Sequence, residues 1–126
     1  MTPLTLAQVA LGGAIGATAR YMAGALATRI AGRGFPWGTL TVNVVGSFLM
    51  GALVVALAER FGNRLAPFLM TGVLGGFTTF STFSLDVATL VERGRPGAAA
   101  GYALASVALS VGALFAALWL MRGWFR

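Results

Sequence analysis

The middle of a long apolar segment, residues 65–91, is interrupted by a sequence that is unsuited to a lipid-facing helix. Residues 75–84 read Gly-Gly-Phe-Thr-Thr-Phe-Ser-Thr-Phe-Ser, so that two adjacent glycines precede a run of hydroxyl and phenyl side chains. Backbone that leaves the helical hydrogen-bond pattern at membrane depth is tolerated only where it is buried in protein or lines a wet cavity. The segment therefore predicts a helix broken near the membrane midplane, a construction that is typical of ion sites.

The remaining sequence predicts a membrane protein around this break. Of the 126 residues, 58% are hydrophobic and only 10% are charged, which leaves too little polar surface for a soluble domain. Four apolar stretches are each long enough to cross about 30 Å of hydrocarbon. They cover approximately residues 4–30, 36–58, 65–91 and 97–121. We therefore expect an all-α fold with four transmembrane helices in a single domain, residues 1–126.

The first apolar stretch has one competing interpretation, a cleaved signal peptide. Ala17-Thr18-Ala19 has the small-x-small form of a cleavage site. However, no lysine or arginine precedes the apolar run, and the run continues to Ile30. We therefore interpret this stretch as a membrane span. Trp37, Trp119 and Trp124 lie near the expected ends of spans, where tryptophan anchors helices at the interface.

The arginines bear on how the chain inserts in the membrane. All nine basic residues are arginines, and Arg20 lies inside the first span. Four of the others fall on the face that would hold both termini: Arg60, Arg64, Arg122 and Arg126. The remaining four fall on the opposite face: Arg29, Arg33, Arg93 and Arg95. Orientation follows the bias of Lys and Arg between loops. The balance predicts insertion in both orientations and an antiparallel, dual-topology homodimer; a weak bias is the alternative. Arginines spread over two faces do not indicate nucleic-acid binding.

Small residues recur at the spacing that lets membrane helices pack closely. The pairs are Gly12 with Gly16, Ser47 with Gly51, Gly72 with Gly76, and Gly97 with Gly101. Such small-xxx-small pairs allow two helix backbones to approach each other. In a chain rich in glycine and alanine each pair alone is weak evidence. Together they predict a tightly packed bundle that assembles as a dimer.

Two helices carry polar stripes. Thr39, Asn43 and Ser47 recur at every fourth position of the second span, and Tyr102, Ser106 and Ser110 do so in the fourth. Residues at this spacing share one helix face. The stripes predict the walls of a polar track, although serine and threonine also bond to carbonyls of their own helix. An amide is costly in lipid without partners, so Asn43 is expected to face the track or to make a key interhelical contact.

The inventory of polar groups favours an anion as the ion. Arg20 lies near the middle of the first span, where a guanidinium by default marks a functional site. It must snorkel, meet backbone carbonyls or lie beside a water-filled entrance, and snorkelling to a helix end is the purely structural alternative. Hydroxyl, amide and guanidinium groups donate hydrogen bonds, and phenyl edges carry partial positive charge. A cation track would require carboxylates or stacked carbonyls, and the spans contain only Asp86. Unwound carbonyls at residues 75–79 provide the one alternative, a site for a single hard cation.

Three motifs together resemble the Fluc (CrcB) family of fluoride channels. The motifs span residues 12–21 (GGAIGATARY), 38–48 (GTLTVNVVGSF) and 72–84 (GVLGGFTTFSTFS). The resemblance covers essentially the whole chain, and the third motif is the most specific. It implies a dual-topology antiparallel homodimer in the bacterial cytoplasmic (inner) membrane, with two pores that export fluoride passively and confer fluoride resistance.

The resemblance also implies roles for individual residues. Phe80 and Phe83 would line the pores and Asn43 would be the pore asparagine. The hydroxyl track would be formed by Tyr102, Ser106 and Ser110, with Ser81 nearby. The polar stripe of the second span would add Thr39 to this track. Arg20 corresponds to an arginine near the pore entrance. A structural Na⁺ at the dimer centre would be held by backbone carbonyls, here those of Gly75 and Thr78. Asp86 departs from the glutamate that the family is expected to have.

Two other classes of membrane protein and the enzymes are disfavoured. A small dual-topology multidrug exporter would need a membrane-embedded carboxylate in its first span, and the first span of this chain contains none. A membrane assembly protein would not need an amide, a guanidinium and a hydroxyl-rich break at depth. Catalysis is not expected, because the chain has no histidine or cysteine and only three acids.

Overall fold

The protein is all-helical in a computed structural model that describes residues 1–126. Helix α1 covers Pro3–Ala31, and α2 (Trp37–Ala56) continues into a π-helical turn, η1 (Leu57–Phe61). A second π-helical stretch, η2 (Pro67–Leu74), leads into the short α3 (Gly75–Phe77). Helices α4 (Phe80–Glu92) and α5 (Pro96–Trp124) complete the chain. There are no strands, so the prediction of an all-α fold is confirmed.

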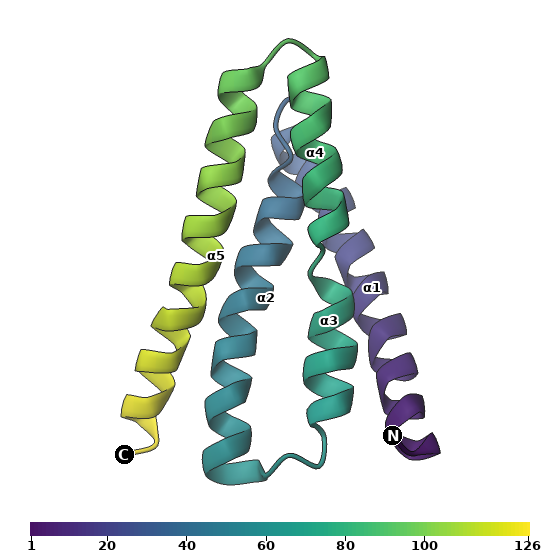
Figure 1. The fold of residues 1–126 in the computed structure, drawn as a ribbon, viewed down its shortest axis with the longest axis vertical. Helices are drawn as coiled ribbons and strands as arrows, with labels where there is room; N and C mark the ends of the chain where they lie inside the picture. The colour runs from purple at the N-terminus through teal and green to yellow at the C-terminus, as the bar shows by residue number, and fades with distance from the viewer.

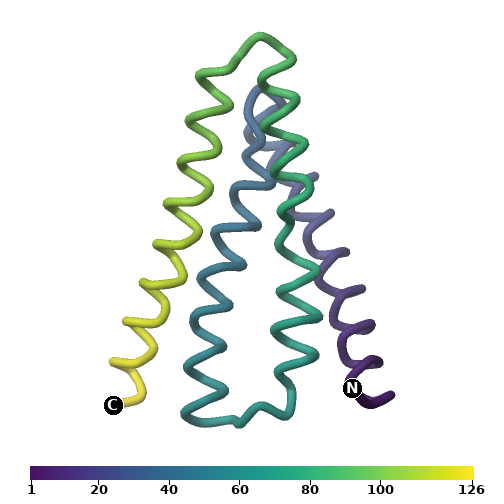
Figure 2. The backbone as a smooth tube through the Cα atoms, viewed as in Figure 1, coloured from purple at the N-terminus to yellow at the C-terminus, as the bar shows by residue number.

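The helices run alternately up and down along one long axis. Both termini lie at one end with the connection between η1 and η2, while the α1–α2 and α4–α5 connections lie at the other (Figures 1 and 2). Arg60 and Arg64 therefore belong to the end with the termini, and Arg33 and Arg95 belong to the opposite end. The loop arginines are thus divided between the ends of the molecule in the way the sequence indicates.

Local sequence explains where the first helix begins and ends. The Thr2 hydroxyl accepts a hydrogen bond from the Thr5 amide, and Pro3 occupies the first turn, where its missing N–H costs nothing. Gly32 ends the helix with φ of 83°, a conformation that favours glycine. Beyond it, the Arg95 side chain donates a hydrogen bond to the Gly34 carbonyl and so ties the two connections at this end together.

Glycines bring α1 against η2 and α3. The Cα atom of Gly12 would lie 2.8 Å from a Cβ added to Gly72, and a Cβ on Gly76 would lie 2.7 Å from the Gly13 carbonyl oxygen. A Cβ on Gly16 would overlap the Val73 carbonyl oxygen. Two of the predicted small-residue pairs therefore face each other across one interface. Gly51 makes the equivalent close approach to α5, at Leu114.

The fourth predicted pair behaves differently. A Cβ added to Gly97 or to Gly101 would meet no atom of the chain within 4 Å. These glycines therefore form no helix contact within the chain, because this face of α5 is turned away from the other helices. The expectation of a close contact at this pair is not met within the chain.

The surface of the chain is largely apolar. Only 16 of 126 residues are buried, and large side chains such as Leu104, Phe115 and Trp119 are mostly exposed. A surface of this kind requires lipid or protein to cover it. By length and composition, three helical segments can cross a membrane rather than the four expected: Trp37–Phe61, Pro67–Glu92 taken across its interruption, and Pro96–Trp124. Helix α1 is 29 residues long but is not among them; it carries Arg20, Gln8 and several glycines, which lower its hydropathy.

Candidate functional site

The helical path is interrupted at Thr78 and Thr79. Both residues are extended, with φ and ψ of −90° and 156° for Thr78 and −152° and 122° for Thr79. The Thr78 hydroxyl donates to the Leu74 carbonyl at 2.9 Å, which closes the end of α3. The Thr79 hydroxyl accepts from the Thr82 amide at 3.1 Å, which caps the start of α4. Threonine at both positions therefore stabilises the two helix ends that the interruption creates.

Asn43 on α2 pairs with the extended backbone through both the oxygen and the nitrogen of its side-chain amide. Its Oδ1 accepts from the Thr79 N–H at 2.8 Å, and its Nδ2 donates to the Thr79 carbonyl at 3.0 Å. This two-point pairing substitutes for bonds that the helix no longer makes. Asn43 thus makes the interhelical contact that was one of its two expected roles, and it keeps one N–H free for another acceptor.

Arg20 pairs with the end of α3. Its Nε donates to the Gly76 carbonyl at 3.0 Å. A guanidinium at a helix C-terminus interacts favourably with the helix dipole and with carbonyls that have no helical partner. Of the three expected settings for this arginine, the structure therefore supports contact with backbone carbonyls.

Other carbonyls at the interruption have no partner in the chain. The oxygens of Gly75, Phe77 and Thr78 accept no hydrogen bond from the backbone or from the side chains that surround them. Gly75 is also exposed on the surface of the single chain. Two of these three carbonyls, those of Gly75 and Thr78, are the ones that the family resemblance implicates in cation binding. No cluster of carboxylates or imidazoles competes with them as a metal site.

A groove of about 340 Å³ runs beside the interruption between α2, α4 and α5. It brings together most of the residues that the sequence singles out. Its predicted members are Asn43, Ser47, Phe80, Phe83, Ser106 and Ser110. Thr78 and Thr79 complete the polar lining, and Val107, Val111 and Leu114 form the apolar side. Two residues of each polar stripe therefore line one groove: Asn43 and Ser47 on α2, and Ser106 and Ser110 on α5.

Aromatic rings close one side of this groove. The ring centroids of Phe80 and Phe83 are 5.5 Å apart, and those of Phe83 and Tyr102 are 5.2 Å apart. Tyr102 is fully buried and its hydroxyl donates to the Asp86 carboxylate at 3.0 Å. The only hydrogen of this hydroxyl is therefore directed to Asp86, and Tyr102 supports the groove from behind. Phe80 is 77% exposed in the single chain.

Ser106 is the one buried side chain with an unsatisfied polar atom. It is 6% exposed, and its Oγ has no hydrogen-bond partner. A buried hydroxyl without a partner costs about 1–3 kcal/mol, so such a group requires an explanation. Because Ser106 lines the groove, its hydroxyl is available to a ligand that accepts a hydrogen bond.

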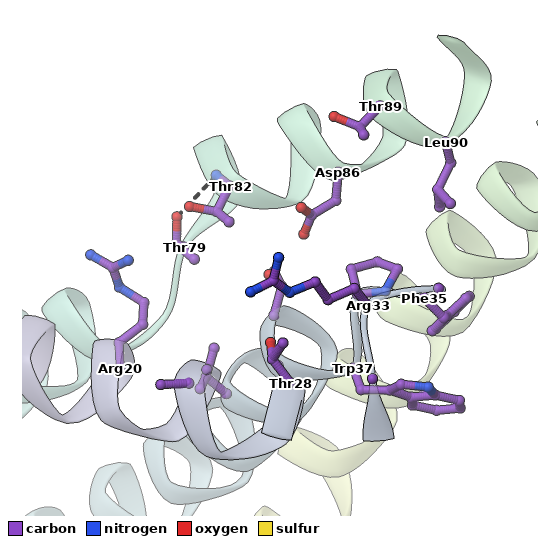
Figure 3. Close-up of a pocket in the computed structure, with 18 of the residues that line it drawn as sticks. Arg20, Thr28, Arg33, Phe35, Trp37, Thr79, Thr82, Asp86, Thr89 and Leu90 are labelled. Carbon is purple, nitrogen blue, oxygen red and sulfur yellow. Dashed lines mark hydrogen bonds between the residues drawn. The ribbon is translucent and has the colours of Figure 1, made fainter. Parts of the chain in front are cut away.

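A second and larger cavity, of about 640 Å³, lies toward the end that holds the α1–α2 connection. Arg20, Thr39, Thr82 and Asp86 line it, and so does Thr79, which also lines the groove. Figure 3 shows Arg20 approaching Thr79 from α1, with Thr82 and Asp86 further along α4. Thr79 therefore stands at the junction of the two spaces.

The predicted residues thus divide into three groups. Asn43, Phe80, Phe83, Ser106 and Ser110 line the groove, whereas Arg20 and Thr39 line the larger cavity. Tyr102 lies behind the groove, and Ser81 lines neither space, although its Oγ is 3.3 Å from that of Thr79. Thr79 itself was not singled out. The signal for it is its position directly before α4, where a threonine caps a helix.

These features define a class of protein: a helical membrane protein with a polar groove beside an interrupted helix. The particular family follows from sequence comparison. The profile of the family described as CrcB-like protein, Camphor Resistance (CrcB), matches residues 7–118. The chain belongs to this family.

Close relatives carry a more specific name. A protein of Cereibacter sphaeroides named fluoride-specific ion channel FluC is 62% identical over 95% of this chain and 96% of the relative. Proteins of the same name from Paracoccus denitrificans and Agrobacterium fabrum are 56% and 54% identical. These matches cover 96% and 97% of this chain, and 97% and 99% of the relatives. The name describes transport rather than catalysis, in agreement with the expectation that the chain is not an enzyme.

Proposed function

We propose that this protein is a fluoride-selective passive channel that releases fluoride from the bacterial cytoplasm across the inner membrane. The observation that carries the proposal is the groove, in which the unpartnered Ser106 hydroxyl lies among hydrogen-bond donors. The names of the close relatives support the same ion. Neither a multidrug exporter nor an assembly protein accounts for this arrangement, and no carboxylate lies in the groove to couple protons.

The proposed path begins in the larger cavity. Fluoride enters beside Arg20, passes Thr79 where the two spaces meet, and continues along the groove past Asn43 to Ser106 and Ser110. Each of these side chains offers an N–H or O–H donor. Donors placed in succession replace the hydration shell of the ion while binding it weakly enough for release.

Selectivity in this proposal depends on close contact. Fluoride is small and strongly hydrated, so it needs donors at short range to offset the loss of water. The phenyl edges of Phe80 and Phe83 carry partial positive charge and narrow the passage. Chloride is larger and less well matched to such a passage, and it is expected to be excluded.

We propose that two chains of opposite orientation form the channel, each with four membrane-spanning helices. The Fluc resemblance and the even division of arginines support the pairing, and the exposed Phe80 ring offers a surface that a partner would cover. The helix interruption would then lie near the midplane of the membrane. Each of the two chains would contribute one pore.

The same arrangement suits a structural Na⁺. The Gly75 and Thr78 carbonyls have no partner within the chain, and oxygen ligands suit hard cations. A two-fold axis beside them would double the number of oxygens. Thus the residues fit the ion, whose role would be to hold the two interruptions together.

One experiment tests both the dimer and the cation. We expect detergent-solubilised protein in Na⁺ to have the mass of two chains, after correction for bound detergent. Replacing Na⁺ by N-methyl-D-glucamine is expected to shift the population toward single chains. A single-chain mass in both solutions would contradict the dimer, whereas an unchanged two-chain mass would contradict the structural role of Na⁺.

Substitution of Ser106 by alanine is expected to move stability and transport in opposite directions. Removal of an unpartnered buried hydroxyl relieves a desolvation cost, so the free energy of unfolding should rise by about 1 kcal/mol. Fluoride flux should fall by on the order of tenfold, because a donor of the path is lost. Both quantities can be measured on the same purified variant.

Val107→Ala in the same groove is the matched control. It removes apolar volume next to Ser106 without changing a donor, so it should lower stability slightly and leave the flux near that of the wild type. If Ser106→Ala conducts fluoride as fast as the wild type, its hydroxyl has no role in the path.

A further inference from the structure

The larger cavity is lined by more positively charged side chains than a single small anion would need in order to pass. Three arginines line it: Arg20 from α1, Arg33 from the α1–α2 connection and Arg93 from the end of α4. Asp86 is the only acid on its walls. Its volume of about 640 Å³ lies within the range of about 300–1,000 Å³ that is usual for small-molecule pockets. The cavity is thus large and positively charged.

Two of these arginines make no side-chain hydrogen bond within the chain. Arg20 donates to the Gly76 carbonyl, but neither Arg33 nor Arg93 donates a side-chain hydrogen bond within the chain. Arg33 extends into the cavity toward Asp86 (Figure 3). The Asp86 carboxylate already accepts a hydrogen bond from Tyr102, at 3.0 Å. The guanidinium groups of Arg33 and Arg93 are therefore available to a ligand.

The chemistry of the lining matches a phosphate group. Arginine presents a planar fork of N–H donors that binds phosphate oxygens in pairs. The hydroxyls of Thr28 and Thr89 add further donors to the same walls. A phosphate group has several oxygens, so it can accept paired hydrogen bonds from two guanidinium groups at once. A monatomic anion offers a single acceptor atom and cannot accept as many.

The position of the cavity brings it within reach of lipid. It lies toward the end of the molecule where α1 ends and α2 begins, next to Trp37, a residue type enriched at the membrane interface. Basic pockets between membrane helices on the cytoplasmic side bind anionic head groups. We propose that Arg33 and Arg93 bind a phosphate monoester or diester group at the mouth of this cavity. Its source is either a lipid head group or free phosphate.

Binding to the purified full-length protein tests this directly. Native mass spectrometry would count bound phosphatidic acid against phosphatidylcholine, and equilibrium dialysis would measure labelled inorganic phosphate against nitrate. The double variant Arg33→Gln with Arg93→Gln should bind the phosphate ligand at least about tenfold more weakly. The matched control is Arg60→Gln with Arg64→Gln, two exposed arginines at the opposite end, which should stay within about twofold.

A third variant should act in the opposite direction. Asp86→Asn removes the one negative charge that faces the cavity and keeps an oxygen that can accept from Tyr102. It should tighten binding on the order of threefold, because repulsion of the phosphate is removed. Glu59→Gln, at the other end of the molecule, should have no effect.

Each outcome has a distinct meaning. Arginine-dependent binding of phosphatidic acid but not of inorganic phosphate supports the lipid as the source. Arginine-dependent binding of inorganic phosphate without preference for phosphatidic acid supports free phosphate. If the wild type prefers neither ligand over its control, or if both double variants lose binding equally, the proposal is overturned. None of these readouts depends on fluoride transport.

Discussion

Replacing Asn43 by leucine is expected to destabilise the protein severely and to abolish fluoride flux. Leucine has the same branched outline as asparagine, although its methyl groups make it larger, and it cannot replace the two hydrogen bonds to the Thr79 backbone. The Thr79 N–H and carbonyl would lose their side-chain partner in a partly buried position, at a cost of about 1–3 kcal/mol for each group left unsatisfied. We expect the free energy of unfolding in mixed micelles to fall by about 4 kcal/mol.

Two further variants separate the structural and transport roles of this amide. Ser47→Ala, one turn further along the same face of α2, removes a groove hydroxyl that makes no hydrogen bond within the chain, and it should cost less than about 1 kcal/mol. Asn43→Asp keeps the acceptor for the Thr79 N–H but loses the donor and adds a negative charge. It should unfold less readily than Asn43→Leu while conducting no fluoride, because the charge repels an anion. An unfolding free energy for Asn43→Leu equal to that of the wild type would refute the pairing as a source of stability.

The second large effect is expected at Gly16. A Cβ added at this position would overlap the Val73 carbonyl oxygen and approach the Phe77 amide nitrogen to 2.9 Å. Both neighbours belong to the backbone and cannot move like a flexible side chain. Gly16→Ala should therefore force α1 away from η2 and α3, at a cost of about 3 kcal/mol. The same displacement would pull Arg20 from the Gly76 carbonyl and reduce fluoride flux.

Gly13 supplies the matched control, because it lies in the same helix, less than one turn away. A Cβ there would meet no atom of the chain within 4 Å. Gly13→Ala should not lower the free energy of unfolding, and its better helix propensity should raise it by up to about 1 kcal/mol. Equal stability of the two variants would show that the close approach of α1 to η2 and α3 does not occur.

The chain leaves the helical conformation at Thr78 and Thr79, where the sequence holds local signals for a helix end. Adjacent glycines followed by threonines favour a helix end and a new N-cap, and the structure caps α4 with Thr79. The sequence did not predict which residue of the extended segment Asn43 would bind. Asn43 was expected to face the track or a helix contact, but its pairing with Thr79 depends on how α2 packs beside α4, which helical spacing within α2 does not determine.

The polar stripes likewise show what helical spacing can predict and what depends on how the helices pack together. Helical spacing places Thr39, Asn43 and Ser47 on one face, yet Thr39 lines the larger cavity while Asn43 and Ser47 line the groove. The interruption at Thr79 lies between the two spaces and divides the face of α2 between them. Likewise, the spacing of Tyr102 with Ser106 predicts a shared face but not that Asp86 engages the tyrosine hydroxyl.

The most direct test is fluoride release from liposomes that contain the purified wild-type protein, read with a fluoride electrode while chloride release is measured in parallel. Valinomycin provides a potassium path that balances the charge of a leaving anion. We predict rapid, valinomycin-dependent release of fluoride with little release of chloride. Absence of fluoride release from protein that is demonstrably folded, or equal release of both anions, would contradict a fluoride-selective channel.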